Sequence, residues 1–175
     1  MENQFRQKFG KFISDNLDKP LNIRFISSNV NLPLEIVNYN PEMNWDWEQI
    51  SCNKALTMKY ILFNLHKCWD WDNISINPSI TIQDIEENPG NHWYWNKIAT
   101  KNISIEFILK NLDKNLNFSN ISRSSKITMK NILDNPNVPW NWKNISQRDD
   151  LTFNIIDSNP NKAWSWGWIS RNSNI

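Results

Sequence analysis

The sequence is short of the features that mark several large classes of protein. It contains three glycines and two cysteines, Cys52 and Cys68, and its 19 basic residues are nearly balanced by 18 acidic ones. So little glycine argues against flexible linkers and phosphate-binding loops. Two cysteines form no disulfide framework and fit a reducing compartment. A net charge of +1 gives no field that would attract nucleic acid or an acidic membrane surface.

Long hydrophobic runs are also missing. No apolar stretch approaches the roughly 18 residues that a membrane span needs. The first twelve residues carry Glu2, Arg6, Lys8 and Lys11 instead of the apolar centre of a signal peptide. We therefore expect an intracellular protein that is neither secreted nor inserted into a membrane.

Tryptophan, in contrast, is abundant, and most of the eleven tryptophans recur at a fixed interval. Pairs of aromatic or aliphatic residues, separated by one position, define a repeat of about 24 residues. The pairs are Leu21/Ile23, Trp45/Trp47, Trp69/Trp71, Trp93/Trp95, Leu116/Phe118, Trp140/Trp142 and Trp164/Trp166.

Further columns keep the same interval. An isoleucine follows the second member of each pair by three positions, and a serine follows it in all copies except at Ala99. The isoleucines are Ile26, Ile50, Ile74, Ile98, Ile121, Ile145 and Ile169. An asparagine precedes each pair by five positions, and in four copies a proline follows it. The asparagines are Asn16, Asn40, Asn64, Asn88, Asn111, Asn135 and Asn159.

These columns predict two helices in each repeat. The longer helix begins after a residue of a type that favours helix N-caps, namely Thr57, Thr81, Ser104, Thr128 or Thr152. We expect it to end at the asparagine column, with the asparagine in the left-handed conformation. The shorter helix begins after the residue between the two aromatics, which is an N-cap type in Asp46, Asp70, Asn117, Asn141 and Ser165 but not in Tyr94.

The Trp-x-Trp-x-x-Ile motif is explained by the shorter helix. The first Trp precedes the cap and packs on the Ile at the fourth helical position, and the second Trp shares the face of that Ile. A β-strand would also place both tryptophans on one face, but the caps and the spacing of three favour helices. We predict an all-α fold, a short right-handed solenoid of six to seven repeats. It would be a single domain with a capping helix over residues 1–16, repeats over 17–170 and a tail over 171–175.

The motif also carries a resemblance. The segment from Asn135-Pro136 through Trp140-Asn141-Trp142 to Ile145-Ser146 resembles the Trp-rich repeats of proteins of unknown function encoded by giant double-stranded DNA viruses of amoebae. The resemblance covers about Asn16 to Ser170. It implies a viral origin and growth by duplication, and a location in the host cytoplasm, the viral factory or the virion. It brings no activity and no catalytic residues.

Two sets of motif residues have a structural and a functional interpretation. The tryptophans could stack nucleic-acid bases, but their fixed place between helix caps favours a role in the core. The asparagines could bind a ligand, but an amide has several hydrogen-bonding groups to satisfy. We therefore expect a buried structural ladder in which each asparagine bonds the backbone of a neighbouring turn. The ladder comprises Asn40, Asn64, Asn88, Asn111, Asn135 and Asn159.

The positions that change from copy to copy are better candidates for binding. Two columns on the longer helix vary in chemistry, and in solenoids such columns line the partner surface. The first column is Lys59, Gln83, Glu106, Lys130 and Asn154. The second column is Phe63, Glu87, Lys110, Asp134 and Ser158. Trp168 lies outside the motif columns, so we expect it to be exposed on an apolar edge suited to self-association.

Chemistry-bearing residues form no convincing site. Cys52, Cys68, His66 and His92 could be imagined around zinc, but none is paired at ligand spacing. The acidic pairs Glu86-Glu87 and Asp149-Asp150 fall at unrelated places in the repeat. We therefore expect no enzyme activity, no metal, no cofactor and no small-molecule substrate.

The sequence thus favours a scaffold that binds a protein partner, viral or host. One alternative is a self-associating structural or virion protein, suggested by the apolar C-terminal edge with Trp164, Trp166 and Trp168. A second alternative is a nucleic-acid-binding repeat protein, against which the near-zero net charge argues.

Overall fold

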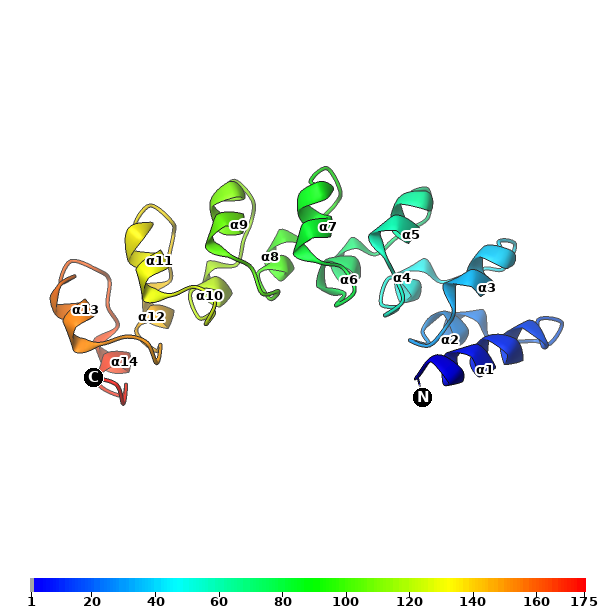
Figure 1. Ribbon diagram of the computed structural model, residues 1–175, viewed down its shortest axis with the longest axis horizontal. Helices are drawn as coiled ribbons and strands as arrows, with labels where there is room; N and C mark the ends of the chain where they lie inside the picture. Colours follow the sequence, from blue (N-terminus) through cyan, green and yellow to red (C-terminus); the bar gives the residue numbers. More distant parts are fainter. Residues whose placement is uncertain (1) are drawn as a thin grey trace. The chain divides into compact units, whose positions relative to one another are not determined.

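The computed structural model describes residues 2–175, apart from the side chains of residues 2, 3, 5 and 6. Every regular element in this range is a helix, and the helices follow one another at a regular spacing (Figure 1). The all-α helical repeat predicted from the sequence is therefore confirmed, while its handedness stays a prediction. The residues form two compact units, Met1–Tyr94 and Trp95–Ile175.

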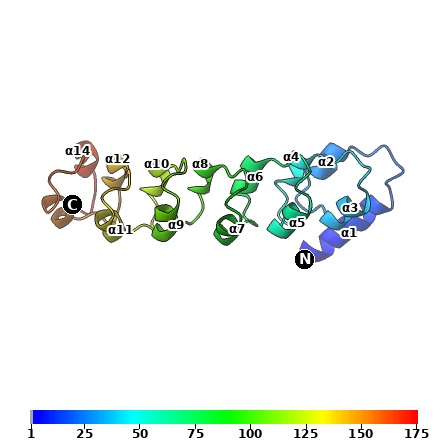
Figure 2. The ribbon, with the colours of Figure 1, turned by 90° about the horizontal axis from the view of Figure 1, so that it is seen from above.

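Both units are built from alternating shorter and longer helices. In the first unit, the helices are α1 (Glu2–Ser14), α2 (Ile23–Ser27), α3 (Leu34–Tyr39), α4 (Trp47–Ile50), α5 (Met58–Phe63), α6 (Trp71–Ile76) and α7 (Ile82–Glu87). In the second unit, they are α8 (Trp95–Ile98), α9 (Ile105–Lys110), α10 (Phe118–Ile121), α11 (Met129–Asp134), α12 (Trp142–Ile145), α13 (Phe153–Asp157) and α14 (Trp166–Ile169). Within each unit the even-numbered shorter helices form one row, and the odd-numbered helices from α3 onward form another (Figure 2).

The predicted N-caps set where most of these helices begin. The Thr57 hydroxyl accepts a hydrogen bond from the Tyr60 amide, and the Asp70 carboxylate accepts one from the Asn73 amide. Such side chains satisfy a backbone donor that the first helical turn leaves free. Thr152 and Ser165 occupy the cap position without making this bond.

The ends of the longer helices differ from the prediction. No residue other than glycine in the described range has a positive φ, and the asparagines at the ends of these helices have φ near −130°, as in Asn88. The reason is that each asparagine amide donates back to the carbonyl four residues earlier, for example Asn88 Nδ2 to Asp84 O at 2.8 Å. This bond closes the helix without a left-handed residue.

The predicted asparagine ladder is confirmed in its bonds to the backbone of a neighbouring turn and is wrong in its burial. All six asparagines are half-buried, and each side chain bonds a carbonyl of its own helix. In five copies the backbone carbonyl of the asparagine also accepts the indole N–H of the Trp five residues later, as in Trp93 to Asn88 at 2.7 Å. These contacts fold one repeat upon itself and do not join it to the next.

The core of each unit combines the isoleucine column, the first aromatic of each pair and apolar residues at the start of the longer helices, such as Leu56 and Ile61. Ile50 and Ile74 in the first unit and Ile121 and Ile145 in the second are fully buried. The first tryptophan of each pair is buried, and within a unit its ring meets the second aromatic of the preceding pair edge-on, for example Trp47 and Trp69 at 5.0 Å between centroids. Edge-to-face packing of this kind favours aromatic pairs beyond the area that they bury.

The serine of the motif supplies a link between successive repeats. The buried Ser51 hydroxyl donates to Trp47 O at 2.8 Å and accepts the amide N–H of Asp70, the next N-cap, at 3.0 Å. The same bond to the following N-cap amide recurs from Ser27, Ser75, Ser122 and Ser146. The serine column therefore explains why Ser follows Ile in the motif.

Replacing Ser51 with alanine leaves the Asp70 amide without its acceptor. We expect the free energy of unfolding to fall by about 1–3 kcal/mol, as measured by urea unfolding followed by circular dichroism. Ser170→Ala is the matched control, because Ser170 makes the same bond within its helix but is exposed. Equal losses in the two variants would contradict the link between repeats.

Helix α1 packs against the first repeat. Ile13 is almost fully buried, and a Cβ atom built on Gly10 would lie 2.9 Å from Cγ of Pro33, at the start of α3. Only a residue without a side chain allows α1 to approach α3 so closely.

Candidate interaction surface

The two variable columns lie where the sequence places them, on the longer helices. All ten residues are exposed. The two columns are four residues apart, so their members lie one turn apart on the same face of each helix. Gln83 Nε2 donates to Glu87 Oε1 at 2.7 Å, and Lys130 pairs with Asp134 at 2.6 Å. Exposure is thus confirmed, and the binding role of these residues stays a prediction.

Each longer helix presents a different pair to solvent. On α5 the ammonium group of Lys59 lies 6.0 Å from the centre of the Phe63 ring. On α9 a hydrogen bond from Ser104 and the nearby charge of Lys110 lower the pKa of Glu106. On α13 the pair is Asn154 and Ser158, which carry no charge. The surface therefore changes in charge and polarity from one repeat to the next.

A groove of about 430 Å³ lies between α5 and α7, within the first unit. Met58, Leu62 and Phe63 of α5 supply its apolar lining, and Asp84 and Glu87 of α7 supply carboxylates. Three members of the variable columns, Lys59, Phe63 and Glu87, thus line one hollow from neighbouring repeats. Spacing alone could not reveal that hollow.

The second aromatic of each pair is half-buried in every repeat except the last, and in several repeats a lysine ammonium group lies over its ring. The ammonium groups of Lys67, Lys114 and Lys162 lie 5.2, 5.8 and 5.2 Å from ring centres of Trp47, Trp95 and Trp142. Asn91 occupies this lysine column in another repeat, and its side-chain nitrogen is buried without a hydrogen-bond partner in the described structure. The lysines therefore stabilise the fold, and Asn91 is a local defect in it.

Asn91→Lys should raise the stability of the chain. It removes the unpaired amide and places an ammonium group over Trp71, and we expect a gain of about 0.5–1 kcal/mol. Asn91→Met removes the amide without adding a cation and is the control. A lysine variant no more stable than the methionine variant in urea unfolding would refute the cation–π contribution.

A buried polar column that the sequence analysis missed joins the repeats. It lies three residues after the isoleucine column, and Asn53, Asn77 and Arg148 are its buried members. Asn77 Nδ2 donates to Ser51 O at 2.9 Å and Asn53 O at 3.1 Å, in the preceding repeat. Bonds between repeats therefore come from this column, whereas the asparagines that end the longer helices bond within their own helices. The period of the column was visible in the sequence, but its mixture of Asn, Lys, Ser and Arg concealed it.

Arg148 is the charged member of this column. Its side chain is 6% exposed, and all five N–H groups have acceptors. The acceptors are both carboxylate oxygens of Asp150 and the backbone carbonyls of Ser122, Ser124 and Ile127. A buried charge needs such complete pairing to be tolerated.

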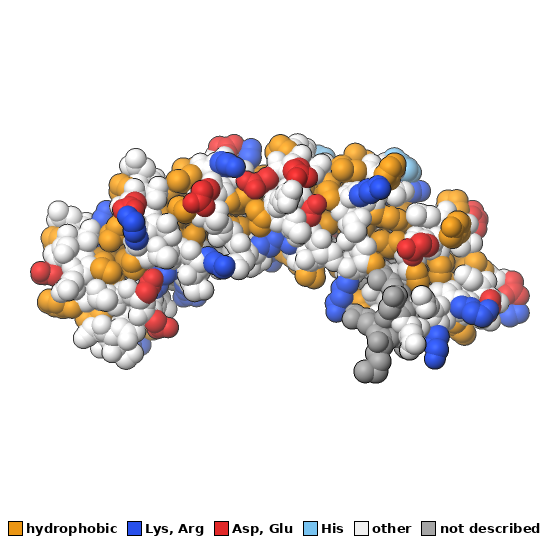
Figure 3. Space-filling view, viewed as in Figure 1, with side chains coloured by type: hydrophobic (Ala, Val, Ile, Leu, Met, Phe, Trp, Pro, Cys, Tyr) orange, Lys and Arg blue, Asp and Glu red, His pale blue; other side chains and the backbone are white. Residues whose placement is uncertain are grey.

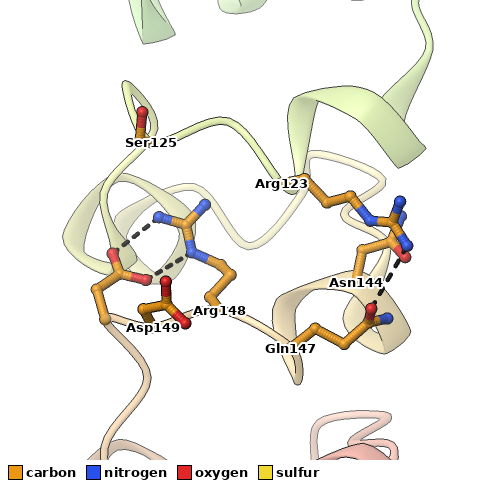
Figure 4. A pocket seen from close by; sticks show the side chains of 7 residues that line it. Arg123, Ser125, Asn144, Gln147, Arg148 and Asp149 are labelled. Atoms are coloured by element: carbon orange, nitrogen blue, oxygen red, sulfur yellow. Dashed lines mark hydrogen bonds and ion pairs between the residues drawn. The ribbon is translucent and has the colours of Figure 1, made fainter. Parts of the chain in front are cut away.

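A polar pocket of about 460 Å³ adjoins this guanidinium group in the second unit. Figure 4 shows Arg148 directed at a carboxylate on one side and Arg123 beside Gln147 on the other. Because every donor of Arg148 is already bonded, this residue has none left for a ligand. The arrangement therefore explains the fold of this repeat and does not define a binding site.

Arg148 also makes the stability of the second unit depend on pH. The hydrogen bonds and charge of Arg148 lower the pKa of Asp150 from its ordinary value of 3.8. A lowered pKa in the folded state gives stability that is present above 3.8 and is lost as pH falls through the folded pKa. We expect the difference in unfolding free energy between the wild type and Asp150→Asn to shrink over that acid range. Asp149→Asn controls for the lost charge, and a difference independent of pH would contradict the assignment.

The C-terminal aromatics differ in part from the prediction. Trp168 is exposed as expected, at 36%, and the Arg171 guanidinium lies 5.6 Å from its ring centre. Trp166 is more exposed, at 64%, although it belongs to the motif. Within residues 2–175 no aromatic side chain meets Trp166 edge-on, as Trp164 meets Trp142. Trp164, which the prediction placed on the same edge, is instead buried at 7%.

The residues considered for chemistry are scattered. Cys52 and Cys68 are exposed free thiols. Partial desolvation of the Cys52 thiol, and second the negative charge of Asp70, raise the pKa of Cys52. His66 and His92 are exposed. In the part of the chain that the structure describes, His, Cys, Asp and Glu form no group of three that could hold a metal ion. In the same part, no helix has the length and apolar character needed to cross a membrane.

Comparisons with known proteins gave no match to a family model, to a curated protein or to a solved structure.

Proposed function

We propose that the chain is a non-enzymatic repeat scaffold that binds a protein partner through the exposed columns of its longer helices. The observation that supports this most is the division of residues within each repeat. Most motif residues are buried or half-buried, whereas the residues that vary between repeats are exposed together on the longer helices. In repeat proteins, exposed columns of varying chemistry form partner surfaces.

The resemblance of the repeat motif to viral repeats suggests where the protein and its partner come from. The Asn-Pro-x-x-x-Trp-x-Trp-x-x-Ile-Ser motif resembles repeats encoded by giant viruses of amoebae, so we propose a viral protein with a viral or host partner. Two exposed free thiols, Cys52 and Cys68, support an intracellular site such as the host cytoplasm, the viral factory or the virion.

Affinity capture from infected amoebae, followed by mass spectrometry, tests the proposal. The wild type is compared with two double variants that each convert two exposed acids to lysine. Glu106→Lys with Asp134→Lys alters the longer helices, and Glu48→Lys with Asp72→Lys alters the shorter ones. We expect recovery of the partner to fall about ten-fold only with the first. Recovery of the bait alone, or equal loss with both variants, would contradict the proposal.

Self-association is a second candidate, and the exposed ring of Trp166 favours it. Large exposed aromatics are enriched at interfaces between proteins, and Trp168 lies on the same short helix. Light scattering of the chain over a range of concentrations is the test. We expect a dimer that Trp166→Ser converts to a monomer, and a strict monomer at high concentration would exclude it.

Nucleic-acid binding receives less support. The first tryptophan of each pair is buried, so its ring is not available to stack on a base. The exposed columns contain acidic side chains beside basic ones, which would repel phosphates.

A further inference from the structure

The groove between α5 and α7 has an apolar side that is specific to its repeat. Leu62 and Phe63 are both exposed, Phe63 at 75%. The later members of the Phe63 column are Glu, Lys, Asp and Ser, so this position becomes polar in every following repeat. One repeat earlier the column holds Tyr39, which is also exposed. The first unit therefore presents aromatic rings to solvent at positions where the second unit is polar.

The opposite side of the groove is acidic. Asp84 and Glu87 line it, and Glu86 lies beside them on the same helix. Helix α7 contains no basic residue, and its last turn carries two glutamates where the helix dipole favours a cation. Lys59 is the one basic residue that lines the groove, and its ammonium group lies over the Phe63 ring. The groove thus has more negative charge than positive charge.

The combination of an apolar side and an acidic side indicates which class of ligand the groove can bind. Hydrophobic side chains reach the surface over α5 and α7 with acidic ones beside them (Figure 3). Nucleic acid would meet repulsion from the carboxylates. The groove is open, so a small apolar molecule would remain largely in water. A peptide side chain of matching size can bind there, because contacts made by the rest of the peptide add to its affinity.

We propose that this groove binds a peptide segment of the partner protein in which a large apolar side chain lies beside Lys or Arg. The apolar side chain packs on Met58, Leu62 and Phe63, and the cation lies between the carboxylates of Asp84 and Glu87. This proposal rests on the proposed function and names the chemistry that the first unit recognises. Charge complementarity then decides which partner sequences bind.

The test is a selection from a phage-displayed library of random peptides of about 12 residues, with the full chain as bait. We expect the enriched sequences to combine a large aliphatic or aromatic residue with a neighbouring Lys or Arg. A synthetic peptide of the strongest sequence is then titrated by fluorescence polarisation. Glu87→Lys and Phe63→Ser should each weaken its binding about ten-fold. Glu48→Lys, the same charge change on a shorter helix, should leave binding within about two-fold.

Four results would overturn the proposal. They are enrichment of acidic or purely polar peptides, no enrichment at all, binding that neither groove variant weakens, and competition by a second copy of the chain. The last is read by light scattering, as self-association that Glu87→Lys abolishes. The proposed function is tested independently of this groove, because its capture experiment alters Glu106 and Asp134 and leaves the groove residues unchanged.

Discussion

Trp69→Ala is expected to lower the free energy of unfolding by about 3–5 kcal/mol. The indole ring is buried, its N–H donates to Asn64 O at 2.9 Å, and Trp47 meets it edge-on at 5.0 Å. The substitution therefore opens a large cavity, removes the edge-on contacts with Trp47 and Tyr60, and removes one of the two donors to Asn64 O. Urea unfolding followed by circular dichroism measures the loss.

Trp166→Ala is the matched control for this prediction. Trp166 belongs to the same motif but is largely exposed, so we expect a loss within about 0.5 kcal/mol. Trp69→Phe separates the hydrogen bond from the packing, because it keeps a ring and removes the N–H. Comparable losses from Trp69→Ala and Trp166→Ala would show that the motif tryptophans are not core residues.

Arg148→Met is expected to cost about 3–5 kcal/mol in the second unit. The methionine side chain fills much of the space but donates no hydrogen bond. The carbonyls of Ser122 and Ile127 then lose their side-chain donor, and each buried unpaired group costs about 1–3 kcal/mol, whereas Ser124 O keeps its bond from the Ile127 amide. The Asp150 carboxylate loses its partner as well, but it is about half exposed and can be hydrated.

The residues found elsewhere in the column of Arg148 suggest a substitution that should restore part of the lost stability. Asn stands at the equivalent position in Asn77 and Asn172, where its amide donates to carbonyls of the preceding repeat. Arg148→Asn should therefore be less destabilising than Arg148→Met. Arg123→Met makes the same change on an exposed arginine of the same pocket and should cost less than about 0.5 kcal/mol. Equal losses for Arg148→Met and Arg148→Asn would contradict the role of this column in bonding between repeats.

Much of the fold could be predicted because the same local signals recur in seven copies. The caps at Thr57 and Asp70 and the burial of Ile50 and Ile74 follow from residue type and spacing. Helix starts depend on side chains within three residues, so a sequence contains the information needed to find them. Register between repeats depends on contacts 19 to 26 residues apart, such as those of Ser51 and Arg148.

The errors have a common physical cause. An asparagine at a helix end can take the left-handed conformation or bond back to its own helix, and the sequence does not distinguish these outcomes. Asn88 takes the second and is half-buried, so the predicted left-handed conformation and the predicted burial are wrong. Asn53 and Asn77 carry the bonds to neighbouring repeats, in a column that also admits Arg148.

For the candidate surface, the exposed columns of the longer helices could be predicted from the sequence, but the grooves between neighbouring helices could not. The exposure of Lys59, Gln83 and Lys130 follows from helical periodicity. The groove at Phe63 and Glu87 depends on how two helices in successive repeats lie side by side, and only the structure provides that.

The central claim is that binding belongs to the longer helices, while the tryptophan motif holds the fold. Site-specific photo-cross-linking in infected cells tests it most directly, with a benzophenone amino acid placed at one position at a time. Gln83 and Lys130 report on the longer helices, and Asp72 and Lys143 report on exposed positions of the shorter ones. We predict that a discrete partner protein is cross-linked at Gln83 or Lys130 and not at Asp72 or Lys143. Cross-linking confined to the shorter helices, or equal at all four positions, would contradict the claim.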